Sequence, residues 1–434
     1  MNQRKAYLQY FFKAIQPLRY ALLKFVHTSV DQIDESSDVD MVITQGETAL
    51  FLDVIRKGPD IEKVTLHRKS FATYVSLYFA DGSYLEIDLI NQFNRKGIQY
   101  LNPQEVLDHS TLNANGLKLA SHHHNFEYIL LFYQLNHSAV PEKYRDYFTT
   151  FTFEERASIF THITSRYKVN INVLDELYEI KTRFSKKIVA YVKRLPVNKG
   201  LFRLYHKAEY LKDLMRDLMY QRGITVTFSG VDGAGKSTII EEVKETLQKK
   251  YRHRTVVLRH RPSLLPILSS FKHGKSAAEK KTREKLPRQG DNNSTVSSIF
   301  RFMYYYVDYV LGQYYIYFRY TLRGYTVLYD RYYFDFIIDA KRSNIVLPKP
   351  FMKWCYNFVF KPQVNVFLFA PVDVIRSRKN ELSESDINSL TSEYKELFEE
   401  LGKSGSRQHY LVINNTDLNK TLHIVMKECL SASA

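Results

Sequence analysis

The spacing of apolar and polar residues changes twice along the chain, and each change marks a region of different predicted structure. The first region begins with an amphipathic pattern over residues 5–27 that predicts a helix. Short runs of β-branched and aromatic residues follow, and they predict strands over 39–43, 64–66, 74–79 and 84–90, with a hairpin turn at 80–83. This mixture predicts an α+β domain over residues 1–120.

Helical spacing dominates the second region. Apolar residues recur three and four positions apart, as at Tyr128, Leu131 and Leu135, which predicts a helical connector over 121–221. The third region, 222–434, alternates between strand and helix patterns, so we expect a doubly wound α/β domain whose parallel sheet is covered on both faces. Its predicted strands are 224–228, 254–258, 325–329, 364–369 and 410–413.

No stretch of the chain has the pattern of a membrane span. The most apolar segment, 299–322, contains Arg301 and Asp308 and is predicted to be a buried helix. The N-terminus lacks the apolar core of a signal peptide, and Cys355 and Cys429 imply no disulfide framework, so a cytoplasmic location is expected. The formal net charge of +16 favours anionic partners such as nucleotides, anionic glycans or a membrane surface.

One segment carries a specific chemical pattern. Residues 228–238 read FSGVDGAGKST, which fits G-x-x-x-x-G-K-[ST], and they stand between a predicted strand and a predicted helix over 239–247. In this context the glycines let backbone amides surround an anion, and the helix N-terminus adds unpaired N–H groups. The predicted phosphate-binding residues are Gly230, Asp232, Gly233, Ala234, Gly235, Lys236, Ser237 and Thr238.

These residue types predict how a nucleoside triphosphate binds, with ATP and Mg²⁺ as the expected cofactors. Lys236 can reach the β- and γ-phosphates, and the Ser237 hydroxyl can ligate Mg²⁺. Asp330 and Arg331 follow the predicted strand 325–329, and active sites of open parallel sheets lie at the carboxyl ends of their strands. Asp330 can hold Mg²⁺ or an acceptor hydroxyl there, and Arg331 can hold an anionic acceptor.

Three further segments are candidates. Residues 376–382 follow the strand 364–369 and can form a cation-rich lid, in which Arg376 or Arg378 stabilises the transferred phosphoryl group; a helix start facing solvent is the alternative. The basic segment 272–298 is predicted to be a loop that either captures an anionic substrate or is a solvated insertion. Residues 412–416 end the last predicted strand, where a nucleotide base can pack.

As a set, these motifs resemble the thymidylate kinase family across residues 222–434. The loop at 228–238, an Asp-Arg-aromatic signature at 330–332 and the lid at 376–382 follow the family pattern. The resemblance implies a phosphoryl-transferring kinase. In that family a catalytic arginine comes from the loop or from the lid. Because the loop carries Ala234 here, the resemblance implies a lid arginine, Arg376 or Arg378.

The sequence departs from the family pattern where the acceptor binds. Asp335 stands at a position where the family has serine, and Asp339 with Ala340 replaces the tyrosine–glutamine pair that reads thymine. Since a carboxylate offers different hydrogen bonds from an amide, an acceptor other than thymidine monophosphate is expected. The closer resemblance is to thymidylate kinase-like proteins linked to bacterial surface-polysaccharide synthesis, which implies a sugar, a polyol or a phosphorylated derivative as acceptor.

Acidic residues indicate a second site in the first region. Asp38 and Asp40 share one face at the start of a predicted strand, and Asp88 lies on another predicted strand. Three carboxylates can hold Mg²⁺ for nucleotidyl transfer. Residues 20–120 resemble the nucleotidyltransferase fold, with 27–29 in place of the family's Gly-Ser turn. Three interpretations stay open: an active transferase, a substrate-binding or scaffolding relic, and unrelated exposed acids.

Three functions follow from these motifs. The first is ATP- and Mg²⁺-dependent phosphoryl transfer to a nucleoside monophosphate-like, sugar or polyol acceptor. The second is an NTP-binding regulatory or scaffolding module with degenerate catalytic sites, for which the net charge of +16 favours docking to an anionic glycan or a membrane surface. The third is a bifunctional nucleotidyltransferase-kinase. For any of these functions, a second copy of the chain, forming a homodimer, is a further candidate partner.

Overall fold

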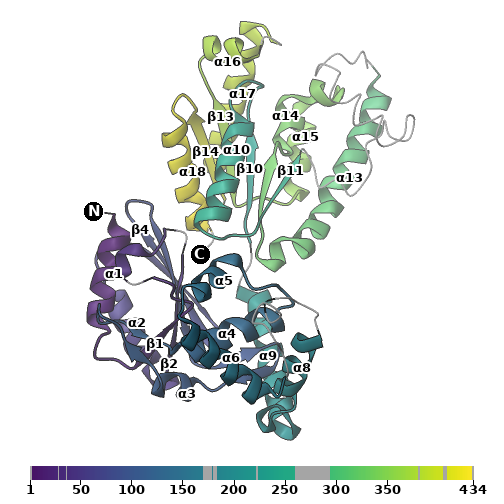
Figure 1. Ribbon diagram of the computed structural model, residues 1–434. Helices are drawn as coiled ribbons and strands as arrows, with labels where there is room; N and C mark the ends of the chain where they lie inside the picture. Colours follow the sequence, from purple (N-terminus) through teal and green to yellow (C-terminus); the bar gives the residue numbers. More distant parts are fainter. Residues whose placement is uncertain are drawn as a thin grey trace. The chain divides into compact units, whose positions relative to one another are not determined.

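The computed structural model divides into two compact units, Met1–Met215 and Arg216–Ala434, and Figure 1 colours the chain from purple to yellow along its length. Most of the basic segment 272–298 lies outside the described residues, and the predicted three-part division at 120/121 and 221/222 stays a prediction. The structure describes residues 2–27, 29–35, 37–169, 178, 183–220, 223–259, 294–379, 382–403 and 408–432.

A seven-stranded mixed sheet forms the centre of the N-terminal unit. In spatial order its strands are β3 (Ile61–Arg68), β4 (Ala72–Phe79), β5 (Tyr84–Ile90), β2 (Val39–Ile43), β1 (Tyr20–Leu23), β9 (Lys118–Leu119) and β8 (Thr111–Leu112). Strands β4 and β5 are antiparallel, so the hairpin predicted at 80–83 is confirmed. Strand β2 is parallel to β5 with Asp40 opposite Asp88, and this register brings two predicted metal ligands onto neighbouring strands.

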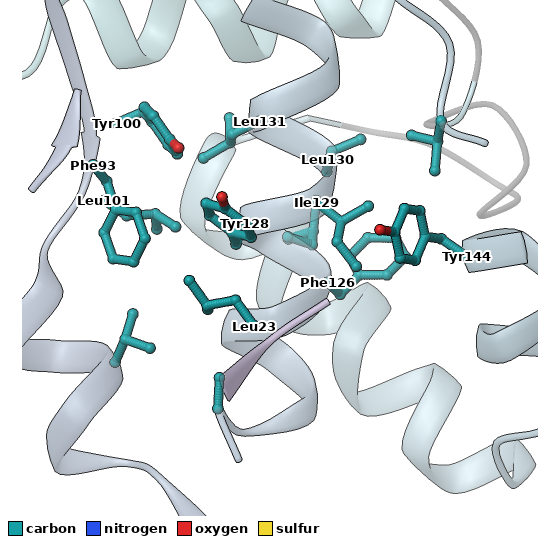
Figure 2. Close-up of a cluster of buried hydrophobic side chains, with 14 of the residues drawn as sticks. Leu23, Phe93, Tyr100, Leu101, Phe126, Tyr128, Ile129, Leu130, Leu131 and Tyr144 are labelled. Carbon is teal, nitrogen blue, oxygen red and sulfur yellow. The ribbon is translucent and has the colours of Figure 1, made fainter. Parts of the chain in front are cut away.

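Helices pack on both faces of this sheet. Alternate residues of its strands point to opposite faces, and they belong to two different hydrophobic cores. Helices α1 and α2 bury Tyr7, Phe11 and Phe51 in one core. Figure 2 shows the other core, in which Tyr128 and Leu131 of α4 lie near strand residues. The helices are α1 (Gln3–Ala14), α2 (Thr48–Arg56), α3 (Pro103–Asp108), α4 (His122–Leu135), α5 (Glu142–Thr149), α6 (Phe153–Tyr167), α8 (Arg183–Lys193) and α9 (Gly200–Tyr220); β6 (Phe93–Arg95) and β7 (Ile98–Leu101) form a separate hairpin.

The helix predicted over 5–27 is wrong in its second half. Helix α1 ends at Ala14, and the next element is strand β1, whose four residues are all buried. Pro17 explains the break, because a proline disfavours helical backbone in the residue before it. A short apolar run fits helix and strand spacing equally well, so the pattern at 20–23 does not distinguish a strand from a continued helix.

The C-terminal unit contains a five-stranded sheet in which every neighbouring pair is parallel. In spatial order its strands are β11 (Thr255–Arg259), β12 (Thr326–Asp330), β10 (Thr225–Ser229), β13 (Val364–Phe369) and β14 (His409–Asn414). All five predicted strands are therefore present. Strand β10 lies in the centre, so the loop that follows it opens at the middle of the carboxyl edge.

Helices cover both faces of this sheet, which confirms the doubly wound α/β prediction. Helices α10 and α18 pack together on one face, and α13, α14, α15 and α17 share an aromatic core on the other. Helix α13, predicted as a buried helix over 299–322, buries only one side, with Phe302, Tyr309 and Ile316 in that core. None of the described helices is both long and apolar enough to cross a bilayer. The helices are α10 (Lys236–Glu245), α13 (Thr295–Arg319), α14 (Phe334–Ile338), α15 (Lys349–Cys355), α16 (Val372–Arg378), α17 (Glu384–Lys403) and α18 (Leu418–Ala432).

Candidate functional site

The glycine-rich loop at 228–238 joins β10 to α10 at the carboxyl edge of the parallel sheet. Gly230 and Gly235 have φ angles of +147° and +86°, which residues with a Cβ rarely adopt. A Cβ on Gly230 would stand 2.3 Å from the backbone oxygen of Leu368, and one on Gly235 would stand 2.4 Å from Nδ2 of Asn415. The loop therefore requires glycine at both positions, for conformation and for space.

The side chain of Lys236 folds back over this loop. It is 6% exposed, and its Nζ donates to the carbonyl oxygens of Gly230 at 2.8 Å and of Val231 at 2.9 Å. Burial, together with the nearby Arg331 guanidinium, lowers the pKa of Lys236 to about 7. An anion in the loop would stabilise the charged ammonium better than neutral carbonyl groups do. Ser237 stands exposed in the first turn of α10, as does the following threonine.

A buried ion-pair network centred on Arg331 lies beside the loop. The guanidinium is 4% exposed and donates to Asp232 at 2.5 Å and to Asp335 at 2.6 Å. Arg342 donates to the other carboxylate oxygen of Asp232 at 2.6 Å. Burial by itself would raise the pKa of Asp232, but Arg331, Lys236 and Arg342 hold it well below its usual range. Arg331, predicted to hold the anion of an acceptor, is thus paired with two carboxylates of the protein.

Asp330 ends β12 at the same edge of the sheet as the loop. In the strand register it lies beside Phe228 of β10 on one side and Arg259 of β11 on the other. The next residue, Arg331, has φ of +78°, and this left-handed conformation turns the chain immediately after the strand. After this turn the Arg331 side chain reaches back to the loop, while Asp330 stays half-buried at the end of the strand.

The two arginines predicted in the lid have different partners. Arg378, at the end of α16, donates from Nη1 to the carbonyl oxygen of Gly233 at 3.2 Å, so it reaches the glycine-rich loop. Arg376 instead pairs with Glu384 at 2.8 Å on the surface. Both are exposed, and residues 380 and 381 of the predicted lid lie outside the described ranges. The structure therefore brings one of the two candidates to the loop.

Two further residues contact the loop and were not among the predicted site residues. Asn415 donates from Nδ2 to the carbonyl oxygen of Ala234 at 2.9 Å, and its segment was predicted only to border a nucleotide base. Arg342 pairs with Asp232 from a stretch that has no motif of its own. The polar residues at the end of β14 could have indicated that Asn415 belongs to the site, whereas no local sequence pattern indicated Arg342.

The three carboxylates predicted as metal ligands in the N-terminal unit lie together. One ligand oxygen from each of Asp38, Asp40 and Asp88 is within 4.8 Å of the others. They line a cavity of about 250 Å³ together with aromatic side chains such as Tyr74 and Phe132. Oδ1 of Asp88 is buried and has no hydrogen-bond partner among the described residues. Burial, together with the charge of Asp40, raises the pKa of Asp88 well above its usual value, so a cation would stabilise this group.

Lys24 contributes a cation to this acidic cavity, and no sequence motif marked it. Its Nζ lies 3.0 Å and 3.1 Å from the two carboxylate oxygens of Asp40 and 4.5 Å from the centre of the Phe132 ring. Burial would lower the pKa of Lys24, but Asp40 raises it well above its usual value, so the ammonium stays charged. Thr28, from the segment in place of the Gly-Ser turn, lies outside the described residues, and Ser29 caps the short helix Val30–Gln32.

The comparisons with known proteins concern the C-terminal unit. Residues 228–423 match the model of the thymidylate kinase family, and this range contains the loop, Asp330, Arg331 and both lid arginines. Among solved structures, the thymidylate kinase from Ehrlichia chaffeensis aligns at 14% identity over 48% of this chain and 98% of its own, with a TM-score of 0.31. A score that low adds nothing to the assignment, and no curated protein matches the chain. By its match to the family, the C-terminal half of this chain is a thymidylate kinase-like domain.

Proposed function

We propose that this protein transfers the γ-phosphoryl group of ATP, in the presence of Mg²⁺, to a nucleoside monophosphate-like, sugar or polyol acceptor. The observation that carries the proposal is the buried ammonium of Lys236, held at 2.8 Å and 2.9 Å by two carbonyl groups of a glycine loop at a helix N-terminus. Backbone carbonyls are weak partners for a buried cation, and the Asp232 carboxylate is 3.8 Å from the same nitrogen, so the site is suited to a polyphosphate in place of the carbonyls.

The residues of the site suggest their roles in this reaction. The loop amides and the N-terminus of α10 would bind the phosphates, and Lys236 would turn from the loop carbonyls to the β- and γ-phosphates. Ser237 is exposed and Asp330 ends the adjacent strand, so both suit Mg²⁺, which neutralises phosphate charge when bound. Arg378 reaches the loop and would stabilise charge that develops on the transferred group.

The acceptor is proposed to differ from thymidine monophosphate. Asp335 accepts from Arg331 at 2.6 Å and from the Tyr394 hydroxyl at 2.9 Å. These contacts fix a carboxylate beside the arginine that we expect to hold the acceptor, so an acceptor with hydroxyl groups to donate suits the site. A role in surface-polysaccharide synthesis is part of this proposal and rests on the resemblance of the sequence motifs alone.

The experiment that tests the proposal measures ADP release that depends on the acceptor. The purified chain is incubated with ATP, Mg²⁺ and one of a panel of nucleoside monophosphates, neutral sugars and polyols. A kinase releases ADP faster with its acceptor than without it. ADP release that stays flat across the panel would instead favour the NTP-binding regulatory or scaffolding function.

Within this assay, Arg378→Ala is expected to lower kcat by about 10²–10³-fold, because one positive charge near the transferred group is lost. Arg376→Ala is the matched control: its partner is the surface residue Glu384, so kcat should stay within a few fold. Since both arginines are exposed, neither change should alter the thermal unfolding midpoint appreciably. The reverse pattern, a loss only with Arg376→Ala, would assign the lid role to the other arginine.

A second function, nucleotidyl transfer in the N-terminal unit, is supported by the cluster of Asp38, Asp40 and Asp88. The contact of Lys24 with both oxygens of Asp40 favours the alternative, a substrate-binding relic, because the ammonium already neutralises one of the carboxylates. The bifunctional nucleotidyltransferase-kinase requires these acids to bind a divalent cation in spite of Lys24.

Lys24→Met is therefore expected to tighten Mn²⁺ binding to the chain at least about tenfold, because the change removes a positive charge adjacent to the proposed ligands. Titration followed by the electron paramagnetic resonance of free Mn²⁺ measures this. Adding Asp88→Asn to the Lys24→Met variant should abolish this gain in Mn²⁺ affinity. Mn²⁺ binding that responds to neither substitution would remove the metal assignment in this unit.

A further inference from the structure

A second cavity in the N-terminal unit has an unusual lining. Its volume is about 320 Å³, and half of its twelve lining residues are carboxamides. No aspartate, glutamate, lysine or arginine lines it among the described residues, although the whole chain carries a net charge of +16. The carboxamides are Gln45, Asn91, Gln92, Gln99, Asn102 and Gln104. Every lining residue belongs to the unit Met1–Met215.

Hydrogen bonds behind the cavity wall position the side chain of His206. Asn94 donates from Nδ2 to Oε1 of Gln92 at 3.1 Å, and the same nitrogen lies 3.4 Å from Nδ1 of His206. Because an amide nitrogen only donates, this contact favours the tautomer in which Nδ1 accepts and Nε2 carries the proton. His206 lines the cavity and is 6% exposed, and its Nε2 has no partner in the described part of the chain.

A buried acceptor without a partner completes this wall. Oδ1 of Asn91 is buried and receives no hydrogen bond from any described residue. Native structures rarely leave such groups unpaired, since each costs about 1–3 kcal/mol. Two of the residues that line the cavity therefore carry a buried polar atom without a partner among the described residues: Nε2 of His206 and Oδ1 of Asn91.

We propose that this cavity binds a neutral, polyhydroxylated ligand, which is a sugar or a polyol. A hydroxyl group both donates and accepts, as does a carboxamide, so the two kinds of group pair in either direction. The cavity has no cation to offset a phosphate or carboxylate, and burial of an unpaired anion is costly. Tyr205, 56% exposed at the rim, offers an aromatic face with little conformational freedom to lose on contact with a sugar ring.

The wall is held in place before any ligand binds. Asn198 accepts from the backbone N–H of Gln99 at 2.9 Å and donates to its carbonyl oxygen at 2.7 Å, which fixes that strand against the start of α9. Asn102 caps helix α3 by accepting from the backbone N–H of Gln104 at 3.0 Å. Such prior order lowers the entropy cost of binding a small ligand.

The cavity also adjoins the acidic cavity described above. Gln92 lines both, and it follows Asp88 on the chain just beyond the end of β5. The binding proposal does not depend on the kinase function, because all of its residues lie in the other unit.

Saturation-transfer difference NMR on the full chain tests the proposal, with D-glucose, N-acetyl-D-glucosamine, ribitol and glycerol as neutral probes and glucose 1-phosphate as the anionic counterpart. We expect saturation transfer to at least one neutral probe and less to the phosphate. Asn91→Leu and Tyr205→Ala should each weaken the Kd at least about tenfold. Tyr210→Ala is the matched control, because Tyr210 is exposed on the same helix and does not line the cavity.

Thermal unfolding separates loss of binding from loss of fold. Asn91→Leu removes a buried acceptor that has no partner, so its unfolding midpoint should not fall. Tyr205→Ala changes an exposed side chain and serves as the second variant. Saturation transfer to none of the neutral probes would overturn the proposal, as would preference for glucose 1-phosphate or binding that neither variant weakens.

Discussion

Replacement of Lys236 by methionine is expected to lower ATP-dependent phosphoryl transfer at least about 10³-fold while the C-terminal unit stays folded. Lys236 is the buried cation of the loop, and methionine keeps the apolar stem but removes the charge. The Gly230 carbonyl would keep a donor, because Arg331 lies 3.3 Å from it through Nη1. The loss should therefore appear in turnover and in ATP affinity rather than in stability.

Acceptor-dependent ADP release measures the turnover of Lys236→Met, and calorimetry with ATP and Mg²⁺ measures its binding. Lys244→Met is the matched control on the same helix, because Lys244 pairs with Glu241 on the surface of α10 and should tolerate the change. Unchanged turnover in a folded Lys236→Met chain would contradict the role of the loop, and with it the proposed reaction.

The sequence could predict the parts of the site that depend on neighbours along the chain. The loop at 228–238 combines glycine spacing with a strand before it and a helix after it, and these local features determine where its amides point. Asp330 was predictable for a similar reason, since a residue that ends a parallel strand lies at the carboxyl edge of the sheet.

The partners of these residues could not be predicted, because they come from distant segments. Arg342 and Asp232 are 110 positions apart, and Asn94 and His206 are 112 apart. No spacing rule connects such pairs, and only the packed fold brings them together. The sequence likewise offered Arg376 and Arg378 as equal candidates, and the difference between them comes from the geometry of the short helix α16.

The acidic cluster shows how far strand alternation can be used. Alternation placed Asp38 and Asp40 on one face, but the contact with Asp88 needed the parallel pairing of β2 with β5. The place of Lys24 in this cavity could not be predicted, because the pattern over residues 5–27 predicts a helix, and a helix would direct the Lys24 side chain elsewhere. Since β1 ends at Leu23, Lys24 instead enters the cavity from the end of a buried strand.

Gly230→Ala is expected to destabilise the C-terminal unit by at least about 3 kcal/mol. Its φ is +147°, and the new Cβ would stand 2.3 Å from the backbone oxygen of Leu368 on the adjacent central strand. Neither atom belongs to a flexible side chain, so relief requires β10 and β13 to separate or the loop to change conformation. Either response would also move the carbonyl that holds Lys236, so ATP binding should be lost together with stability.

Urea unfolding followed by tryptophan fluorescence measures this loss in the correct unit, because the single tryptophan of the chain, Trp354, lies in α15. Gly402→Ala is the matched control: Gly402 lies in α17, and its new Cβ would meet only Cβ of Tyr410 at an ordinary 3.9 Å. Because alanine favours a helix over glycine by about 0.5–1 kcal/mol, this control should be neutral or slightly stabilising. Equal midpoints for the two variants would contradict the requirement for glycine at position 230, both for its φ angle and for the space beside β13.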